Sequence, residues 1–261
     1  MLSINIEKAV KIDSRSSEAY KRLRTNIQFC GSNVKTIALT SCIPNEGKST
    51  VAMNLAASMA ATGKRVLFVD ADLRKSVLVG RYKINQQIKG LTHYLSGVDE
   101  MKDIVYATNI TNMHVIFSGP VPPNPAELLD GDEFKKMISS ARRVYDYVIL
   151  DTPPLGSVID AAIIAAQCDG AILVVSQGTV SRKNLKKTVE QLEKAECRIL
   201  GAVLNKVDLS EDGYYGKYYS NYYGSYYGDY YGTGYGYYGS DSGSGSRGSG
   251  SRKSKKRKKE M

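Results

Sequence analysis

Long apolar runs are absent from this 261-residue sequence. No stretch approaches the roughly 18 apolar residues that a helix needs to cross a bilayer, so the sequence predicts no transmembrane helix. Charged residues interrupt the first twenty positions, MLSINIEKAVKIDSRSSEAY, where a signal peptide would need an apolar core. We therefore expect neither a membrane-spanning nor an exported chain.

Cysteine and histidine are scarce and scattered. The four cysteines show no CxxC spacing, and only two histidines could join them as metal ligands: Cys30, Cys42, Cys168, Cys197, His93 and His114. This pattern argues against a zinc site. Scattered cysteines also fit a reducing cytosol better than a disulfide framework. Cys42 lies in the loop described below, where we expect it to act as an inert small residue.

The positive charge is concentrated at one end of the chain. The formal net charge is +10, but the last 23 residues hold eight lysines and arginines against two acidic residues, a net +6. The remainder is only mildly basic, so charge gives no case for nucleic-acid binding, and we expect no nucleic-acid partner.

Residues 214–238 contain no aliphatic side chain, yet they carry thirteen of the nineteen tyrosines. Tyrosine spaced among Gly, Ser, Asn and Asp predicts a solvated, disordered segment that cannot bury a core. Its hydroxyls are candidate phosphoacceptors, although an adhesive Tyr/Gly tract remains an alternative. The candidates are Tyr214, Tyr215, Tyr218, Tyr219, Tyr222, Tyr223, Tyr226, Tyr227, Tyr230, Tyr231, Tyr235, Tyr237 and Tyr238.

Apolar segments alternate with helical patterns over the rest of the chain. The predicted strands are residues 34–40, 65–70, 114–118, 147–151, 171–176 and 199–204. The predicted helices are residues 14–30, 51–62, 132–145, 158–167 and 181–194. Such alternation predicts a doubly wound, mostly parallel α/β sheet. The predicted layout is one domain over 1–209, a tyrosine-rich tail over 210–238 and a Gly/Ser-rich basic tail over 239–261.

Residues 42–50, CIPNEGKST, follow a predicted strand and open a predicted helix. They match the phosphate-binding loop GxxxxGK[ST] except that Cys42 replaces the first glycine. Backbone N–H groups would cradle phosphates, Lys48 would reach the β- and γ-phosphates, and Ser49 would bind Mg²⁺. We therefore predict a site for a nucleoside triphosphate and Mg²⁺. Its expected members are Asn45, Glu46, Gly47, Lys48, Ser49 and Thr50, with Asn205 from the last predicted strand.

Three carboxylates follow buried strands. Asp70 and Asp72 lie in VLFVDADLR, and Asp151 lies in YVILDTPP. The carboxyl ends of parallel strands meet at the ligand-binding edge of such a sheet. Three carboxylates there allow metal binding and general-base chemistry to be divided among them.

The three segments SCIPNEGKST, VLFVDADLR and YVILDTPP together resemble those of the bacterial tyrosine kinases of the CpsD/CapB type, the P-loop autokinases of capsular and exopolysaccharide synthesis. The likeness also includes SEAYKRLRTNI, SGPVPPNPAELL and GAVLNKVD. It implies a cytoplasmic enzyme that uses ATP and Mg²⁺ to phosphorylate its own C-terminal tyrosines. It further implies an activating membrane-spanning polysaccharide co-polymerase and a cognate tyrosine phosphatase.

The resemblance also assigns roles to single residues. Lys48 would bind phosphates, Asp70 would be the base for the tyrosine hydroxyl, and Ser49, Asp72 and Asp151 would support Mg²⁺. An E-x-x-R-x-x-R pattern in the family contributes to ring-shaped self-assembly, and its positions are occupied here by Glu18, Lys21 and Arg24. We expect a homo-oligomer, although lysine cannot reproduce the two-pronged contact of arginine at the middle position.

Three alternatives remain open. A partitioning or septum-site ATPase shares this class of fold, but Ile43 stands where its extra loop lysine belongs. A GTPase is suggested by Asn205–Asp208, NKVD, but no DxxG segment of the GTPase kind accompanies it. An ATP-sensing scaffold for polysaccharide assembly would share every motif named so far. Lastly, the terminus SRKSKKRKKEM is either a solvated tail or a contact to the anionic inner leaflet of the membrane.

Overall fold

The computed structural model describes residues 2–6, 13–84 and 86–208. Eight strands form one sheet in the order β1-β4-β5-β3-β6-β2-β7-β8, and every neighbouring pair is parallel except β4 with β5. The strands are β1 Leu2–Ile4, β2 Thr36–Ser41, β3 Val66–Asp70, β4 Tyr106–Thr108, β5 Met113–Ile116, β6 Tyr147–Asp151, β7 Gly170–Ser176 and β8 Ile199–Asn205. The predicted doubly wound, mostly parallel sheet is confirmed.

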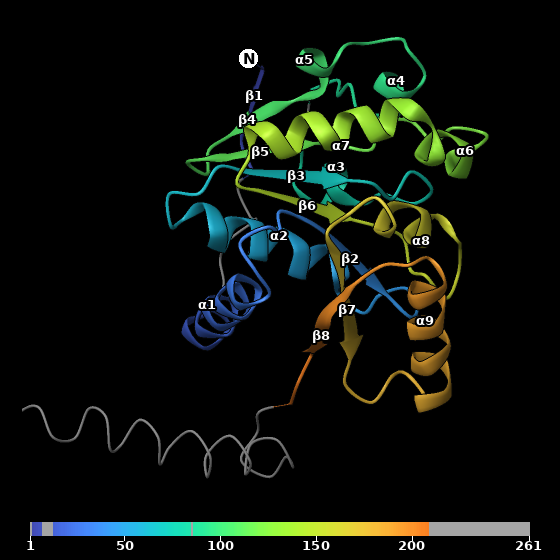
Figure 1. Cartoon of the computed structure of the whole chain (residues 1–261). Coiled ribbons are helices and arrows are strands. Elements are labelled where there is room, and N and C mark those ends of the chain that lie inside the picture. The colour runs from blue at the N-terminus through green and yellow to red at the C-terminus, as the bar shows by residue number, and fades with distance from the viewer. Residues whose placement is uncertain (1, 7–12, 85, 209–261) are drawn as a thin grey trace, which may run out of the picture. The chain divides into compact units, whose positions relative to one another are not determined.

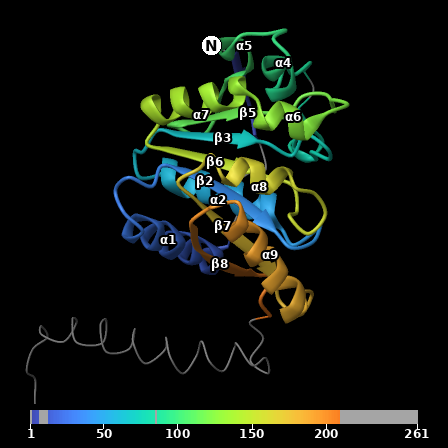
Figure 2. The same ribbon diagram turned by 45° about the vertical axis from the view of Figure 1, so that its right-hand side comes forward.

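Helices cover both faces of the sheet (Figures 1 and 2). Helices α1 and α2 lie on one face, and α7, α8 and α9 lie on the other. The helices are α1 Ser14–Phe29, α2 Lys48–Ala60, α3 Leu78–Arg81, α4 Leu91–Leu95, α5 Met101–Ile104, α6 Pro125–Asp130, α7 Asp132–Val144, α8 Asp160–Ala165 and α9 Arg182–Lys194.

Successive strand residues point to two separate hydrophobic cores. In β2, Ile37 and Leu39 join the core beneath α2, whereas Ala38 joins the core beneath α7 and α8. In β3, Phe68 likewise joins the core beneath α2, and Leu67 joins the core beneath α7 and α8. Because side chains alternate along a strand, a sheet covered on both faces requires apolar residues at almost every position. This explains the unbroken apolar runs in the sequence.

The strands and long helices lie within a few residues of their predicted positions. The main shift is in α2, which begins at Lys48 rather than at residue 51, because the phosphate-binding loop supplies its first turn. The elements that the sequence did not predict are β1, β4 and the short helices α3–α6, each of three to six residues. Such short segments carry too few positions for a periodic pattern.

Among the described residues, none of the helices has the length and hydropathy required to span a membrane. The predicted tyrosine-rich tail, its thirteen candidate tyrosines and the basic terminus all lie outside the described residues.

Candidate active site at the carboxyl ends of the strands

The phosphate-binding loop joins β2 to α2 and contains two residues with positive φ. Asn45 has φ 66° and Gly47 has φ 87°. A Cβ atom on Gly47 would lie 2.2 Å from the Nδ2 atom of Asn205. Position 47 therefore requires glycine for two reasons, the left-handed backbone and the close approach of another side chain.

Glu46 holds this loop from the inside. Its Oε2 atom accepts hydrogen bonds from the backbone N–H groups of Cys42 and Ile43 at 2.7 and 2.9 Å, and its Oε1 atom accepts one from Ser176 at 3.0 Å. The residue is 1% exposed. The carboxylate therefore shapes the loop and links it to the end of β7, and the contact of Glu46 with a nucleotide stays a prediction.

The end of β8 also supports the loop. The Nδ2 atom of Asn205 donates to the carbonyl of Glu46 at 2.8 Å, and Lys206 donates to the carbonyl of Asn45 at 2.7 Å. Asn205 therefore lies beside the loop, and its contact with the nucleotide stays a prediction. Its use as a structural donor there was not foreseen, because only the fold brings residue 205 to residue 46.

Cys42 is buried at the first position of the loop. Burial is the largest effect on the thiol of Cys42 and raises its pKa. A Cβ atom on Gly156 would lie 2.1 Å from the carbonyl oxygen of Cys42, so the segment after β6 packs directly on the loop. A buried thiol with a raised pKa is poorly reactive, in agreement with the inert role expected for Cys42.

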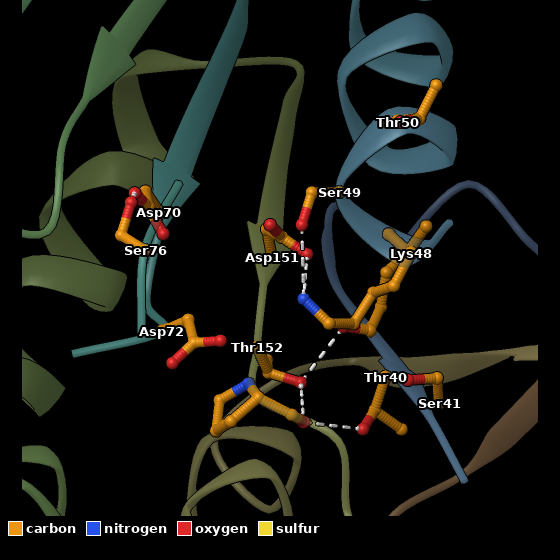
Figure 3. Close-up of polar contacts among 12 residues, drawn as sticks. Thr40, Ser41, Lys48, Ser49, Thr50, Asp70, Asp72, Ser76, Asp151 and Thr152 are labelled. Atoms are coloured by element: carbon orange, nitrogen blue, oxygen red, sulfur yellow. Dashed lines mark hydrogen bonds and ion pairs between the residues drawn. The ribbon is translucent and has the colours of Figure 1, made fainter. Parts of the chain in front are cut away.

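Lys48, Ser49 and Asp151 form one cluster (Figure 3). The Nζ atom of Lys48 lies 2.6 Å from Oδ1 of Asp151 and 3.3 Å from Oγ of Ser49. The side chains of Lys48 and Asp151 are 8% and 2% exposed. Thr50, also predicted to bind the nucleotide, accepts a hydrogen bond from Arg81 at 3.1 Å. The predicted loop and the β6 carboxylate are thus brought into direct contact.

Asp70 lies on the strand next to Asp151, and the two residues are partners in the β3–β6 register. Asp70 is fully buried, its Oδ2 atom accepts a hydrogen bond from Ser76, and its Oδ1 atom has no partner among the described residues. Burial, and then the charge of Asp151, raise the pKa of Asp70 to about 7. This carboxylate can therefore take up or release a proton near neutral pH.

Asp72 lies just beyond β3 and is only partly buried. Its Oδ1 atom accepts hydrogen bonds from the N–H groups of Arg74 and Lys75 at 3.3 and 3.0 Å. The Arg74 guanidinium in turn binds both oxygens of Asp160, which is fully buried, at 2.7 and 2.9 Å. No role was predicted for Ser76, Arg74 or Asp160. Nothing marks Asp160 in the sequence, because its partner lies 86 residues away.

The predicted metal ligands are one hydroxyl and two carboxylates, on Ser49, Asp72 and Asp151. Within the part of the chain that the structure describes, no group of three His, Cys, Asp or Glu residues could hold a metal ion by itself. Mg²⁺ commonly takes one or two carboxylates and completes its shell with water and substrate phosphates. The donor set here has that chemistry.

The three residues predicted to act in assembly lie on α1 and make two different kinds of contact. Lys21 and Glu18 form an ion pair at 2.6 Å, with side chains 54% and 50% exposed. Arg24 instead donates to the backbone carbonyl of Ser58 on α2 at 2.7 Å. Glu18 and Lys21 are available to a neighbouring subunit, whereas Arg24 already fastens α1 to α2. Their role in assembly stays a prediction.

Comparison with known proteins agrees with this geometry. The family model described as an AAA domain matches residues 34–203. The tyrosine-protein kinase CpsD of Streptococcus agalactiae is 44% identical over 217 residues, which cover 81% of this chain and 95% of that protein. The kinase domain of the Escherichia coli tyrosine kinase ETK superposes with a TM-score of 0.69 at 33% identity, over 74% of this chain and 77% of that one.

A septum-site protein, MinD of Pyrococcus horikoshii complexed with Mg-ADP, is more distant. It superposes with a TM-score of 0.60 at 26% identity, over 72% of this chain and 76% of that one. The septum-site alternative is therefore less supported than the kinase. The identities, the coverage and the arrangement of the loop and its carboxylates lead to one conclusion: this chain belongs to the CpsD family of bacterial tyrosine-protein kinases.

Proposed function

We propose that this tyrosine-protein kinase transfers the γ-phosphoryl group of ATP to tyrosines of its own C-terminal cluster, residues 214–238, and thereby regulates capsular or exopolysaccharide synthesis. One observation carries the proposal. A buried cluster of Lys48, Asp70 and Asp151 lies at the carboxyl ends of the strands in the same chain as thirteen clustered tyrosines. The cluster suits phosphoryl transfer, and the tyrosines supply acceptors.

The residues of the site fit a triphosphate and Mg²⁺. Gly47 opens α2, so the N–H groups at the start of this 13-residue helix are directed toward the loop. Among the described residues, one buried oxygen of Asp70 has no partner, which is costly unless a ligand or proton uses it. Ser49, Asp72 and Asp151 would hold Mg²⁺. Bound Mg²⁺ neutralises charge on the phosphate oxygens.

Lys48 is the positive group that faces the phosphates in this proposal. Its ammonium is nearly buried and has Asp151 and Ser49 as partners. A phosphate oxygen would compete with Asp151 for that ammonium, which would free the carboxylate to support Mg²⁺. Removing the positive charge should abolish transfer, because positioning and charge stabilisation supply most of the catalysis in this reaction.

Asp70 is the proposed base. Ser76 occupies Oδ2, so Oδ1 remains to accept the proton of the tyrosine hydroxyl. In the balanced step, the phenolic oxygen forms a bond to the γ-phosphorus, the bond from that phosphorus to the ADP oxygen breaks, and the phenolic proton passes to Asp70. A base with a pKa of about 7 is about half ionised at neutral pH, and it accepts a proton more readily than an ordinary carboxylate does.

The proposal is tested with purified chain, ATP and Mg²⁺, with the activator's cytoplasmic segment added in a parallel reaction. Phosphotyrosine should form in the wild type and in Lys64→Met, which changes an exposed lysine, but not in Lys48→Met. Excess unlabelled GTP should compete poorly with ATP; effective competition would favour the GTPase alternative. Normal polysaccharide production by Lys48→Met cells would favour the ATP-sensing scaffold.

The roles of the three carboxylates can be separated. Asp70→Asn should reduce transfer more than ATP binding, because the base acts on the hydroxyl rather than on the nucleotide. Asp72→Asn and Asp151→Asn should also weaken Mg²⁺-dependent ATP binding. Equal loss of ATP affinity in all three variants would contradict this division of roles.

The proposed setting is the cytoplasmic face of the membrane. A membrane-spanning polysaccharide co-polymerase would activate the kinase, and a cognate tyrosine phosphatase would reverse its action. The eight basic residues after position 238 would attach the chain to anionic lipid, at about 1 kcal/mol each near the surface, and phosphorylation would release it. Vesicle co-sedimentation at low and high salt tests this attachment. Unchanged binding after deletion of residues 247–261 would leave only a solvated tail.

Self-assembly is the remaining part of the proposal. The exposed pair Glu18 and Lys21 would contact a neighbouring subunit, and phosphates on the tail would weaken the assembly by repulsion. Light scattering should show an oligomer after phosphatase treatment and smaller species after phosphorylation. A monomer under both conditions would exclude this part of the proposal.

A further inference from the structure

Helix α9 carries a row of positive side chains on its outer side. The four residues, here called the α9 basic face, are all exposed: Arg182, Lys183, Lys186 and Lys187. At about 100° per residue they occupy a sector of roughly 140°. Thr188 and Leu192, the buried residues of α9, lie on the opposite side of the helix. The basic face is therefore directed away from the core.

The position of these charges along the helix is unfavourable for folding. They lie in the first two turns, where the helix dipole opposes positive charge, and the first turn contains no acidic residue. Helix α7 shows the favourable order, with acidic residues in its first turn and basic residues in its last. In the described part of the chain, the only ion pair of the basic face joins Lys186 to Glu190 at 3.7 Å. Apart from that pair, the charges of the basic face are placed against the helix dipole and do not stabilise the helix through it.

Helix α9 is attached to the active site. It follows β7, and the N–H group of Ser176 at the end of β7 donates to Glu46 of the phosphate-binding loop at 3.0 Å. Because β7 runs parallel to β2, both strands end on the same side of the sheet. The first turns of α9 therefore start from the carboxyl ends of the strands, where the phosphate-binding loop also lies. Figure 1 shows the connection from β7 into α9.

We propose that the α9 basic face binds peptide segments that carry several phosphotyrosines, the product of the reaction proposed above. Each phosphate brings a charge of about −1.5 to −2 and acceptor oxygens suited to arginine and lysine. Binding would keep a partly phosphorylated segment beside the site, so that its next tyrosines are phosphorylated before it leaves. This inference rests on the proposed autokinase function.

One tyrosine pair of the substrate fits within the dimensions of the surface. In residues 214–231, tyrosine pairs recur every four residues, a separation of roughly 13 Å in an extended chain. The four cations lie along roughly 7.5 Å of helix, which is less than that separation, so they face one phosphorylated pair at a time. An anionic membrane is the weaker candidate. Membrane-surface helices expose an apolar side, whereas Thr188 and Leu192 direct the other side of α9 into the protein.

The test uses full-length, phosphatase-treated protein in EDTA without ATP. The probe is a fluorescent peptide with the sequence of residues 214–224, YYGKYYSNYYG, either with all its tyrosines phosphorylated or with none. Fluorescence anisotropy measures its binding to the wild type and to a variant in which all four cations of the α9 basic face are changed to Gln. Glutamine is a good helix former, so α9 should remain folded. The matched control carries the same change at exposed cations elsewhere, namely Lys102, Lys135, Lys136 and Arg143.

The wild type and the control should bind the phosphorylated peptide with affinities within twofold of each other, and the α9 variant should bind at least tenfold more weakly. Binding should fall with added salt, and the unphosphorylated peptide should bind weakly to all three proteins. The inference would be overturned if the α9 variant and the control lost equal amounts of affinity for the phosphorylated peptide, or if neither lost any. It would also be overturned if the α9 variant lost binding to anionic vesicles but kept binding to the peptide.

Intact-mass spectrometry during a reaction with ATP and Mg²⁺ separates this inference from the proposed function. The α9 variant should begin phosphorylation at the wild-type rate but accumulate chains with one or two phosphates, where the wild type moves directly to many. A wild type without any phosphate would refute the proposed function itself. A phosphorylated wild type whose phosphate distribution matches that of the α9 variant would refute the inference alone.

Discussion

Replacing Asp70 by asparagine should stabilise the metal-free, nucleotide-free protein, and the gain should grow as the pH rises. Asp70 is fully buried, and its pKa rises from 3.8 to about 7 because of burial and the charge of Asp151. Between about pH 4 and pH 7, the folded protein holds a proton at Asp70 that the unfolded chain has released. Raising the pH through this window therefore lowers the free energy of unfolding of the wild type.

Asparagine has nearly the shape of the protonated carboxyl group but does not titrate. The variant therefore lacks the contribution of residue 70 to the pH dependence of the free energy of unfolding. For pKa values of 3.8 and about 7, the difference in the free energy of unfolding between Asp70→Asn and the wild type should widen by about 3 kcal/mol from pH 5 to pH 8. Most of this change should fall below about pH 7, above which both states of the wild type have lost the proton.

Urea unfolding in EDTA at pH 5, 6, 7 and 8 measures this difference. Asp132→Asn is the control, because that side chain is 87% exposed and its replacement should not change the pH dependence. A difference between Asp70→Asn and the wild type that stays constant from pH 5 to pH 8 would refute the reasoning. Such a result would mean that Asp70 is ionised at an ordinary pKa and is a poor choice for the base.

Two further predictions concern the supports of the site. Gly156→Ala should weaken ATP binding at least tenfold, as measured by equilibrium dialysis. The new Cβ would lie 2.1 Å from the carbonyl oxygen of Cys42 and would displace the phosphate-binding loop. An unchanged affinity for ATP would contradict this prediction. Arg74→Ala should lower the free energy of unfolding by about 2–3 kcal/mol, since it leaves the buried carboxylate of Asp160 unpaired. Lys75→Ala changes an exposed neighbouring residue and should leave the free energy of unfolding almost unchanged. An equal decrease in the free energy of unfolding in both variants would refute this account.

Much of the fold was predictable from the sequence, for a physical reason. A parallel sheet covered on both faces buries nearly every strand residue, so segments such as residues 66–70 and 147–151 are strongly apolar. The loop and its carboxylates were predictable because each follows such a strand. The short strands β1 and β4, of three residues each, left no periodic signal.

The supports of the site were not predictable from local sequence. Ser76 contacts Asp70, Arg74 contacts Asp160, and the carboxylate of Glu46 turns inward to backbone N–H groups. Each of these contacts depends on which segments the fold brings together, and a serine, an arginine or a glutamate in a loop gives no sign of its partner. The position of Glu46 in the loop can be read from the sequence, whereas the direction of its side chain cannot.

The central claim is that this chain phosphorylates its own tyrosine cluster through the site built around Lys48. The most direct measurement is mass spectrometry of peptides from residues 210–238 after incubation with ATP and Mg²⁺, comparing the wild type with Lys48→Met. The account predicts several phosphotyrosines within residues 214–238 of the wild type and none in the variant. Phosphate at the same tyrosines of purified Lys48→Met, or phosphotyrosine in the wild type only outside this cluster, would contradict it.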